Sequence, residues 1–286
     1  MFWSLNGPAI GVRVPLPELI GLAKRHGFKG VDFNIEEAAT LAQANGLASV
    51  RRLFDDSGVA PTVWGAPVAW RGDEAAFTAS LTRLADFARL ADELGCHRAI
   101  SVMMPFSDER PYAENYRWSV EHFRRVAEVL LPRGIRLGLE YIGPKTLRDA
   151  HKNPFIYTLG GCLDLNADVG TGNLGVLFDA FHWFTSHGTL ADFARIRNAD
   201  IVHVHVNDGR AGRTADEQMD LERALPGETG VIPITGFLRG LADIGYDGGV
   251  AVEPFSPAVN ALPAEEAVAA TAASLRKVWQ AAGLAE

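Results

Sequence analysis

The sequence contains few cysteines and no pattern typical of a disulfide framework or a thiolate metal site. Its 286 residues include two cysteines, Cys96 and Cys162. Two cysteines allow one disulfide at most, and their separation does not match the short Cys/His spacings of zinc sites. Each lies among apolar or small residues, so we expect both to be reduced thiols packed in the interior.

Long apolar runs and blocks of like charge are also absent. The longest apolar runs, such as residues 174–178 and 248–252, are far shorter than the roughly 20 residues of a membrane-spanning helix. The first residues lack the basic segment of a secretion signal. Asp and Glu total 35 against 27 Lys and Arg, a formal charge of −8 that disfavours nucleic acid. We therefore expect a cytoplasmic protein without a membrane or nucleic-acid partner.

The chain instead alternates short apolar runs with longer amphipathic stretches. Hydrophobic residues make up 48% of it, enough for a large core. Eight short runs are predicted strands: residues 2–6, 30–33, 61–65, 98–103, 136–141, 175–178, 201–207 and 249–253. Seven stretches have helical spacing: residues 17–26, 36–57, 74–94, 114–131, 189–197, 235–244 and 264–282. This order indicates βα units around a parallel sheet.

Eight strands with no Pro/Ser-rich linker between them favour a closed barrel over an open sheet. We predict one α/β domain over residues 1–286, a single (β/α)8 TIM barrel. Two connections are enlarged: residues 143–172 after the fifth strand, where short pieces replace a long helix, and residues 208–233 after the seventh. Both would open from the C-terminal face of the barrel, which carries the active site in this fold.

Polar side chains stand at the C-terminal ends of four otherwise apolar strands. They are Glu140, Asp179, His205 and Glu253. Taken singly, each could bond a loop amide or cap the next helix. Together they would place three carboxylates and one imidazole at one mouth, where ionised carboxylates are costly without a cation. Such an oxygen-rich set suits Mn²⁺, Mg²⁺ or Co²⁺, so we predict a shared metal.

These residues lie in motifs that resemble the xylose-isomerase-like TIM-barrel superfamily. The motifs are GLEYIG at Glu140, LFDAFHW at Asp179, VHVHVND at His205, PGETGVIP after it, and VAVEPF at Glu253. The resemblance covers essentially the whole chain. The group includes sugar phosphate isomerases and epimerases, ketose 3-epimerases, inosose isomerases and dehydratases, and hydroxypyruvate isomerases. It implies that the same four residues bind one divalent metal, Mn²⁺ by preference, with Mg²⁺, Co²⁺ or Zn²⁺ as alternatives.

The resemblance also implies the chemistry. A metal bridging a ketone oxygen and its neighbouring hydroxyl would stabilise an enediolate, and Glu140 and Glu253 would move the proton on opposite faces of a small sugar substrate. This predicts a sugar isomerase or epimerase. The alternative is a lyase or dehydratase acting on a keto-inositol or 3-keto-sugar, because the same enediolate can expel a leaving group. The residues do not separate the two.

Two further histidines flank the predicted ligands. His203 lies two residues before His205 on the same strand, so both side chains point to one side and His203 lies deeper, in the packed interior. His182 follows Asp179 by about one helical turn. The resemblance makes His182 a substrate-hydroxyl contact, and the alternative is a histidine that only caps a helix start.

The connections depart from the pattern of free-ketose epimerases. Those enzymes place a second glutamate soon after the first ligand and an arginine six positions after the histidine. In the segment where those enzymes have the second glutamate, this chain has Lys145 and Arg148. At the position of their arginine it has Ala211, with Arg210 and Arg213 nearby. Cations at the mouth would suit a phosphate or carboxylate, although Lys145 and Arg148 could equally be solvated loop residues.

Other candidates are apolar or neutral. Asn6, at the end of the first strand, could offer a hydrogen bond to a sugar, and Trp64, at the end of the third, could offer a stacking face. Trp183 could also stack on a sugar, but packing in the barrel explains it at least as well. Residues 170–175 match G-x-G-x-x-G but lead into a strand rather than a helix, so nucleotide binding is not expected.

Two other function classes are alternatives to this prediction. An AP-endonuclease-like nuclease of the same superfamily would need more strand-end histidines and a basic face. Half of the eight histidines lie elsewhere, at His26, His97, His122 and His151. A barrel that binds a sugar without turning it over stays open. Such barrels often form homo-oligomers, which the resemblance implies and the sequence does not specify.

Overall fold

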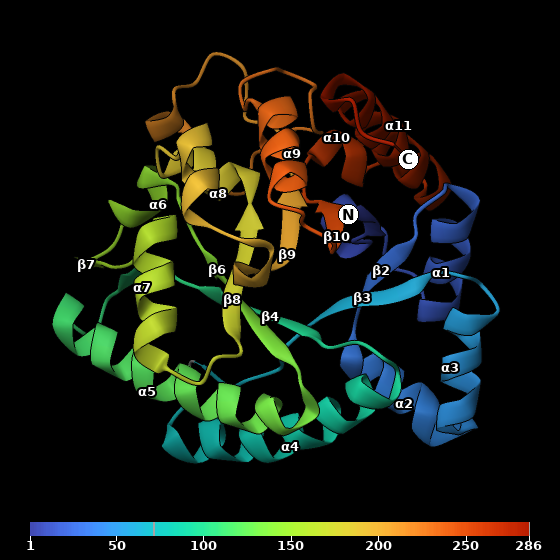
Figure 1. Ribbon diagram of the computed structural model, residues 1–286, viewed down its shortest axis with the longest axis horizontal. Coiled ribbons are helices and arrows are strands. Elements are labelled where there is room, and N and C mark those ends of the chain that lie inside the picture. The colour runs from blue at the N-terminus through green and yellow to red at the C-terminus, as the bar shows by residue number, and fades with distance from the viewer. Residues whose placement is uncertain (71, 286) are drawn as a thin grey trace.

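The computed structural model describes residues 1–70 and 72–285, and its centre is a closed barrel of eight parallel strands. Around the ring, each strand pairs with its neighbours in the order β1, β2, β3, β4, β6, β8, β9, β10 and back to β1 (Figure 1). The strands are β1 (Phe2–Leu5), β2 (Gly30–Phe33), β3 (Ala60–Gly65), β4 (Arg98–Met103), β6 (Arg136–Tyr141), β8 (Leu174–Asp179), β9 (Ile201–Val206) and β10 (Gly249–Val252). The predicted (β/α)8 barrel and all eight predicted strands are confirmed.

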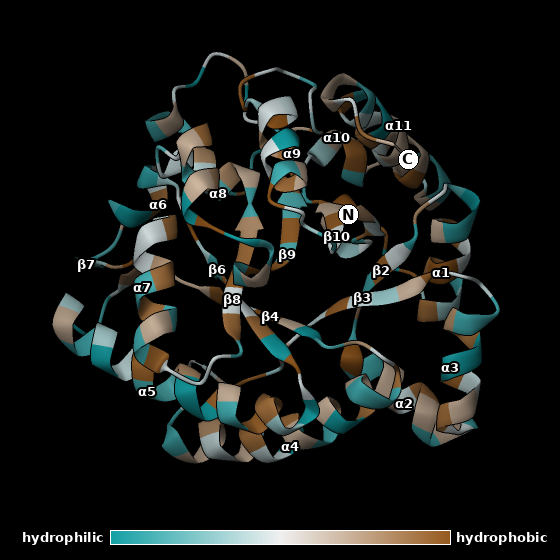
Figure 2. Cartoon of the chain, viewed as in Figure 1, coloured by the Kyte–Doolittle hydropathy of each residue, from teal (hydrophilic) through white to brown (hydrophobic). Residues whose placement is uncertain are grey.

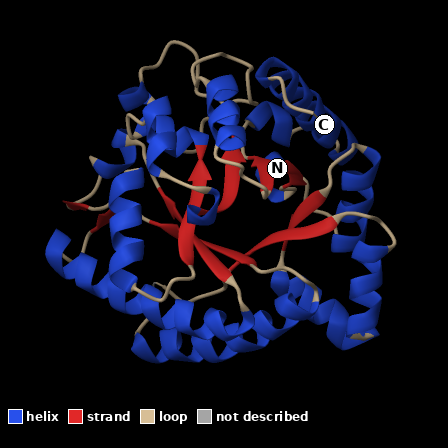
Figure 3. Ribbon diagram, in the orientation of Figure 1, coloured by secondary structure: helices blue, strands red, loops and turns tan. Residues whose placement is uncertain are grey.

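Helices surround the strands on the outside (Figure 3). They are α1 (Leu16–Arg25), α2 (Ile35–Asn45), α3 (Leu47–Asp55), α4 (Glu74–Glu93), α5 (Tyr112–Leu130), α6 (Lys145–Arg148), α7 (Leu159–Val169), α8 (Ala180–Thr185), α9 (Ile234–Asp243), α10 (Pro257–Asn260) and α11 (Ala264–Ala282). Short 3₁₀ helices are η1 (Pro8–Ile10), η2 (Leu131–Arg133), η3 (Leu190–Arg195), η4 (Asn198–Asp200) and η5 (Ala215–Glu217). A small antiparallel sheet, β5 (Phe106–Ser107) with β7 (Asn153–Pro154), lies outside the barrel.

Two predicted helical regions and one predicted connection differ in detail. The region 36–57 is two helices, because Gly46 adopts a φ of 82° that ends α2 and precedes α3. The region 189–197 is the 3₁₀ helix η3 rather than an α-helix. The connection 143–172 consists of short segments, as predicted, except that the last is the eleven-residue helix α7. Gly160 and Gly161 in its first turn made a helix hard to predict there. Thr158 begins that helix by accepting a hydrogen bond from the backbone N–H of Gly161.

The apolar strands lie inside and polar residues concentrate on the outer helix faces (Figure 2). Cys96 and Cys162 are free and buried, as predicted, and burial raises the pKa of each thiol to about 12. Within residues 1–70 and 72–285, no helix is long and apolar enough to cross a bilayer.

An exposed ion-pair group joins the first and last helices. Glu265 of α11 accepts from Arg25 Nη2 at 2.7 Å and lies 2.7 Å from His26 Nε2. Arg25, then His26, lower the pKa of Glu265 from 4.5 to about 2. The stabilisation is therefore present above about pH 4.5 and is lost as the pH falls towards 2.

We expect Glu265→Gln to be less stable than the wild type near neutral pH, with the difference shrinking as the pH falls below about 4.5. Urea unfolding at a series of pH values measures this. A difference that stays constant down to the acid limit would show that packing, not charge, is responsible.

Candidate metal and catalytic site

The structure brings the four predicted ligands together at the C-terminal mouth of the barrel. Glu140 is the last but one residue of β6, Asp179 ends β8, His205 lies on β9 and Glu253 follows β10. One ligand-type atom from each lies within 4.8 Å of all the others. His205 Nδ1 is 3.5 Å from Glu253 Oε2, 3.6 Å from Glu140 Oε1 and 3.8 Å from Asp179 Oδ2. We call these four residues the carboxylate–histidine cluster.

Several polar atoms of this cluster are buried without a partner. Glu140 Oε1 and both ring nitrogens of His205 make no hydrogen bond among the described residues. The separations from His205 Nδ1 are too long for hydrogen bonds but leave room for a central ion. Unpaired buried polar groups cost about 1–3 kcal/mol each. The donor set therefore fits a divalent cation such as Mn²⁺, Mg²⁺, Co²⁺ or Zn²⁺.

Burial and mutual charge perturb the titration of the cluster. Burial and the Glu253 carboxylate raise the pKa of Glu140. Burial lowers the pKa of His205, but the facing carboxylates of Glu253 and Glu140 more than offset it and raise that pKa well above its usual value. Burial likewise opposes ionisation of Asp179, yet Arg223 brings its pKa down to about 2. The pocket thus concentrates negative charge that favours a cation.

Asp179 serves two purposes with two different oxygens. Its Oδ1 accepts from the backbone N–H groups of Phe181 at 2.6 Å and His182 at 3.4 Å, which caps α8. Its Oδ2 faces His205 Nδ1 and Arg223. The helix-cap role and the metal-ligand role, which the sequence presented as alternatives, are therefore compatible in one side chain.

Arg223, which the sequence interpretation missed, is the cation built into this site. It is 1% exposed. Its Nη1 donates to Asp179 Oδ2 and to Glu253 Oε2, both at 2.9 Å, and its Nη2 donates to Asp220 Oδ1 at 2.9 Å. These carboxylates hold the pKa of Arg223 above its usual value despite burial. Arg223 thus fixes one oxygen of each of two cluster carboxylates.

The guanidinium of Arg223 also lies between two aromatic rings. Its central carbon is 4.5 Å from the Phe181 ring centre and 4.8 Å from that of Phe255. From the sequence, we instead named Arg210 and Arg213, which lie in the same connection. The available signal was the spacing of Asp220 and Arg223, which forms an i,i+3 ion pair.

Asp32 of β2 is a second missed residue. Its Oδ2 accepts from His203 Nε2 at 3.0 Å and lies 3.9 Å from His205 Nε2, and its Oδ1 accepts from Ser4 Oγ at 2.6 Å. His205 therefore turns Nδ1 to the cluster, while its Nε2 lies near the Asp32 carboxylate without a hydrogen bond to it. His203 is fully buried below His205, in the packed interior where the sequence placed it.

His182 lies at the edge of the cluster. Its Nδ1 accepts from the backbone N–H of Gly143 at 3.2 Å. Its Nε2 faces Glu140 Oε1 and Asp220 Oδ1, each 3.8 Å away, and is 3.2 Å from Arg223 Nη2. A guanidinium can only donate, so Gly143 and Arg223 both direct N–H groups at the imidazole ring. His182 is therefore held at the edge of the mouth, between the cluster and Arg223.

The basic side chains considered for anion binding are engaged elsewhere or exposed. Lys145 pairs with Asp149 one helical turn away. Arg148 is buried, donates to the carbonyl of Gly143 and lies 3.6 Å from the ring centre of Tyr157. Arg210 is exposed, and its backbone N–H donates to a side chain. None of the three makes a contact that joins it to the cluster.

The neutral candidates have structural roles in the contacts recorded. Asn6 Oδ1 accepts from Ala9 N at 3.4 Å, at the start of η1. Trp64 is buried in the core, and its Nε1 has no partner among the described residues. Trp183 packs against Phe237 and donates to Asp192 Oδ2 at 3.1 Å, which favours the barrel-packing explanation.

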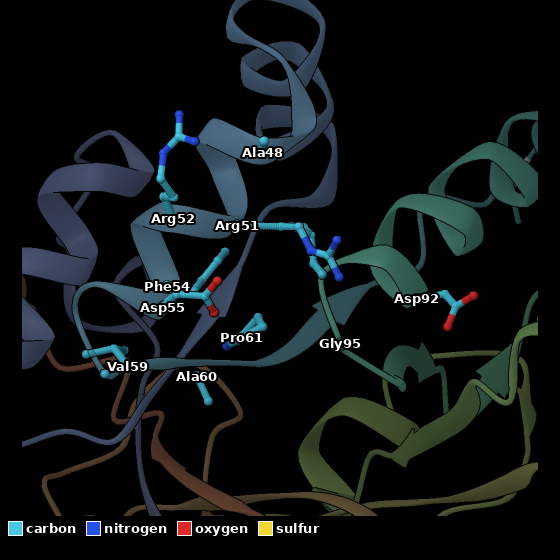
Figure 4. Close-up of a pocket in the computed structure, with 12 residues that line it drawn as sticks. Ala48, Arg51, Arg52, Phe54, Asp55, Val59, Ala60, Pro61, Asp92 and Gly95 are labelled. Atoms are coloured by element: carbon cyan, nitrogen blue, oxygen red, sulfur yellow. The ribbon is translucent and has the colours of Figure 1, made fainter.

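A separate cavity of about 730 Å³ lies at the opposite end of the barrel. Figure 4 shows Arg51 and Arg52 of α3 on one side and Asp92 of α4 on the other. Ala60 and Pro61, which also line it, begin β3. The N-terminal end of barrel strands is associated with stability rather than catalysis, so this cavity is not the candidate site.

Comparison with known proteins places this geometry in a family. The family model for the xylose isomerase-like TIM barrel matches residues 20–278. An inosose isomerase from Halalkalibacterium halodurans is 26% identical over 226 residues, 78% of this chain and 76% of that protein. A D-psicose 3-epimerase from Ruminiclostridium cellulolyticum is 29% identical over 137 residues, 48% of this chain and 40% of that one.

Solved structures agree. A xylose isomerase domain protein from Alicyclobacillus acidocaldarius superposes with a TM-score of 0.87 at 31% identity, covering 99% of each chain. The IOLI protein, solved with a bound zinc atom, has the same fold, with a TM-score of 0.81 at 20% identity over 97% of this chain and 98% of that one. The chain therefore belongs to the xylose isomerase-like TIM-barrel family.

Proposed function

We propose that the protein is a divalent-metal-dependent isomerase or epimerase of a sugar or sugar derivative, working by proton transfer next to a carbonyl. The observation that carries this proposal is the convergence of three carboxylates and one imidazole on one buried point, with ligand-type atoms left unpaired. Relatives named as an inosose isomerase and a D-psicose 3-epimerase support it.

The cluster would hold the metal through Glu140, Asp179, His205 and Glu253, with Mn²⁺ as the proposed ion. When bound, a divalent cation supplies positive charge to a substrate carbonyl oxygen and so acidifies the neighbouring C–H. The protein's own contribution is the position of its acids and bases. Glu140 and Glu253 come from β6 and β10, which two other strands separate in the ring, so they reach the mouth from different sides.

In this proposal one of the two glutamates accepts the proton from carbon and the other returns a proton from the opposite face. Arg223 fixes the Glu253 carboxylate through Oε2. His182, at the edge of the cluster, contacts a substrate hydroxyl. Burial of Glu140, His182 and Arg223 and partial burial of Glu253 limit the access of water and strengthen each electrostatic contact.

The test is solvent exchange in D₂O with Mn²⁺ and a panel of ketoses and keto-inositols. Deuterium should enter at the carbon next to the carbonyl without loss of water. A product lighter by one water would contradict isomerisation and identify a dehydratase instead.

Asp32→Asn should weaken Mn²⁺ binding by about 10–100-fold, because a neutral amide replaces the negative charge that lies 3.9 Å from His205 Nε2. Isothermal titration calorimetry measures this without a substrate. Ser4→Ala is the matched control: it removes the hydrogen bond to the other Asp32 oxygen and should change the affinity much less. Equal affinity of Asp32→Asn and wild type would contradict the role of Asp32.

A further inference from the structure

A second cavity, of about 560 Å³, opens at the C-terminal end of β4. Its lining includes Val102 of β4 and, from α5, Asn115, Trp118 and Ser119. This size is within the range of about 300–1,000 Å³ typical of small-molecule sites. We call it the β4 cavity.

The β4 cavity adjoins the carboxylate–histidine cluster. Val102 is paired with Glu140 in the β4–β6 ladder, so the two side chains point to the same side of the sheet. Val102 is 51% exposed, unusual for an apolar residue within a barrel strand. A molecule centred on the cluster therefore reaches the β4 cavity by extending across one strand.

Two buried polar side chains of α5 line the cavity without a partner. Asn115 is 6% and Ser119 2% exposed, and neither side chain makes a hydrogen bond within residues 1–70 and 72–285. Neither side chain has an internal partner among these residues, so the amide and the hydroxyl are free to bond a ligand that enters the cavity. Both groups can donate and accept, which matches sugar hydroxyls.

The charged side chains around the β4 cavity already have polar or charged partners. Asp108 lies 2.9 Å from His151 Nδ1 and accepts from the backbone N–H of Lys152. Arg110 lies 3.4 Å from Glu109 and 4.4 Å from the Trp118 ring centre. The cavity therefore suits a neutral ligand better than a phosphate or carboxylate.

Aromatic rings complete the lining. Trp70, Phe106 and Trp118 are each partly exposed and border the β4 cavity. Large rings beside a few convergent polar groups give apolar contact area with directional hydrogen bonds, the combination a sugar ring needs.

We propose that the β4 cavity binds a second sugar ring, so that the substrate is a neutral, two-ring saccharide whose reacting ring lies over the carboxylate–histidine cluster. This rests on the proposed function, since it assigns the reacting ring to the cluster. It narrows the substrate class to sugars of two rings, and in it Asn115 and Ser119 of α5 bind the ring that does not react.

The experiment compares binding of cellobiose, maltose, sucrose and trehalose with binding of glucose, glucose 6-phosphate and 4-nitrophenyl glucoside, by calorimetry and tryptophan fluorescence in the presence of Mn²⁺. At least one disaccharide should bind about tenfold more tightly than glucose, as expected for two added hydrogen bonds. In the Asn115→Ala/Ser119→Ala double variant this advantage should disappear, while the affinities for glucose and Mn²⁺ stay unchanged.

Ser274→Ala is the matched control, because Ser274 of α11 also has an unpartnered buried hydroxyl but lies outside the cavity lining. The single variant Ser119→Ala, expected to lose part of the advantage, serves if the double variant does not fold. The inference is overturned if no disaccharide binds more tightly than glucose, or if glucose 6-phosphate or the nitrophenyl glucoside binds most tightly. It is also overturned if the variants weaken the binding of glucose as much as that of the disaccharide. Failure of the wild type to bind Mn²⁺ would instead contradict the proposed function.

Discussion

Glu140→Gln is expected to lower the exchange rate by about 10²–10⁴-fold, because an amide cannot accept the proton that a carboxylate takes from carbon. The shape of the side chain is kept, so its buried surroundings stay packed. Glu140 Oε1 has no hydrogen-bond partner among the described residues, so the substitution breaks no hydrogen bond of that atom. Deuterium exchange under saturating Mn²⁺ measures the effect.

The same substitution should also weaken Mn²⁺ binding, since one of four anionic or imidazole donors is replaced by a neutral oxygen. Calorimetry on the two proteins separates affinity from turnover. Glu265→Gln, the same chemical change on the outer surface, is the control and should alter neither. Exchange at the wild-type rate in Glu140→Gln would remove Glu140 from the proposed proton transfer.

Arg223→Met should lower the free energy of unfolding of the metal-free protein by about 3–5 kcal/mol, because it leaves buried carboxylates without their cation. In the wild type, Arg223 bonds to Asp179, Asp220 and Glu253 at 2.9 Å. Methionine fills similar space between the Phe181 and Phe255 rings without charge. Urea unfolding in the presence of a chelator gives the difference.

Mn²⁺ should recover much of that loss, since a dication between the same carboxylates replaces the missing charge and binds the folded state alone. The rise in melting temperature on adding Mn²⁺ should therefore be larger for Arg223→Met than for the wild type. Arg210→Met, at an exposed arginine of the same connection, is the control and should match the wild type. Equal stability of Arg223→Met and wild type in chelator would show that the carboxylates do not depend on Arg223.

The strands and the four-residue cluster were predictable because both depend on local pattern. Each strand is a short apolar run, and Glu140, Asp179 and Glu253 stand where such a run ends. Parallel strands in a barrel bring those ends to one mouth. His205 was chosen over His203 because it lies nearer the mouth on the strand, and the resemblance to a known family supported that choice.

Arg223 and Asp32 were not predictable in the same way. Arg223 lies in a long connection where several arginines look alike, and only the folded path of that connection buries one of them. Asp32 is a residue in the middle of a four-residue strand, and its partner His203 is 171 residues away. The contact exists only across the closed barrel, so no local spacing could indicate it.

Closure of the ring determines when, during folding, the protein can first bind its metal. The first strand pairs with the last, Trp3 opposite Val250 and Ser4 opposite Ala251, and Glu253 follows directly. Contacts between chain ends form late, because a long loop must close before they form. During synthesis, the fourth donor of the cluster emerges after nearly nine-tenths of the chain. Tight Mn²⁺ binding would therefore mark the moment at which the ring closes, and rapid-mixing metal uptake could time that step of folding.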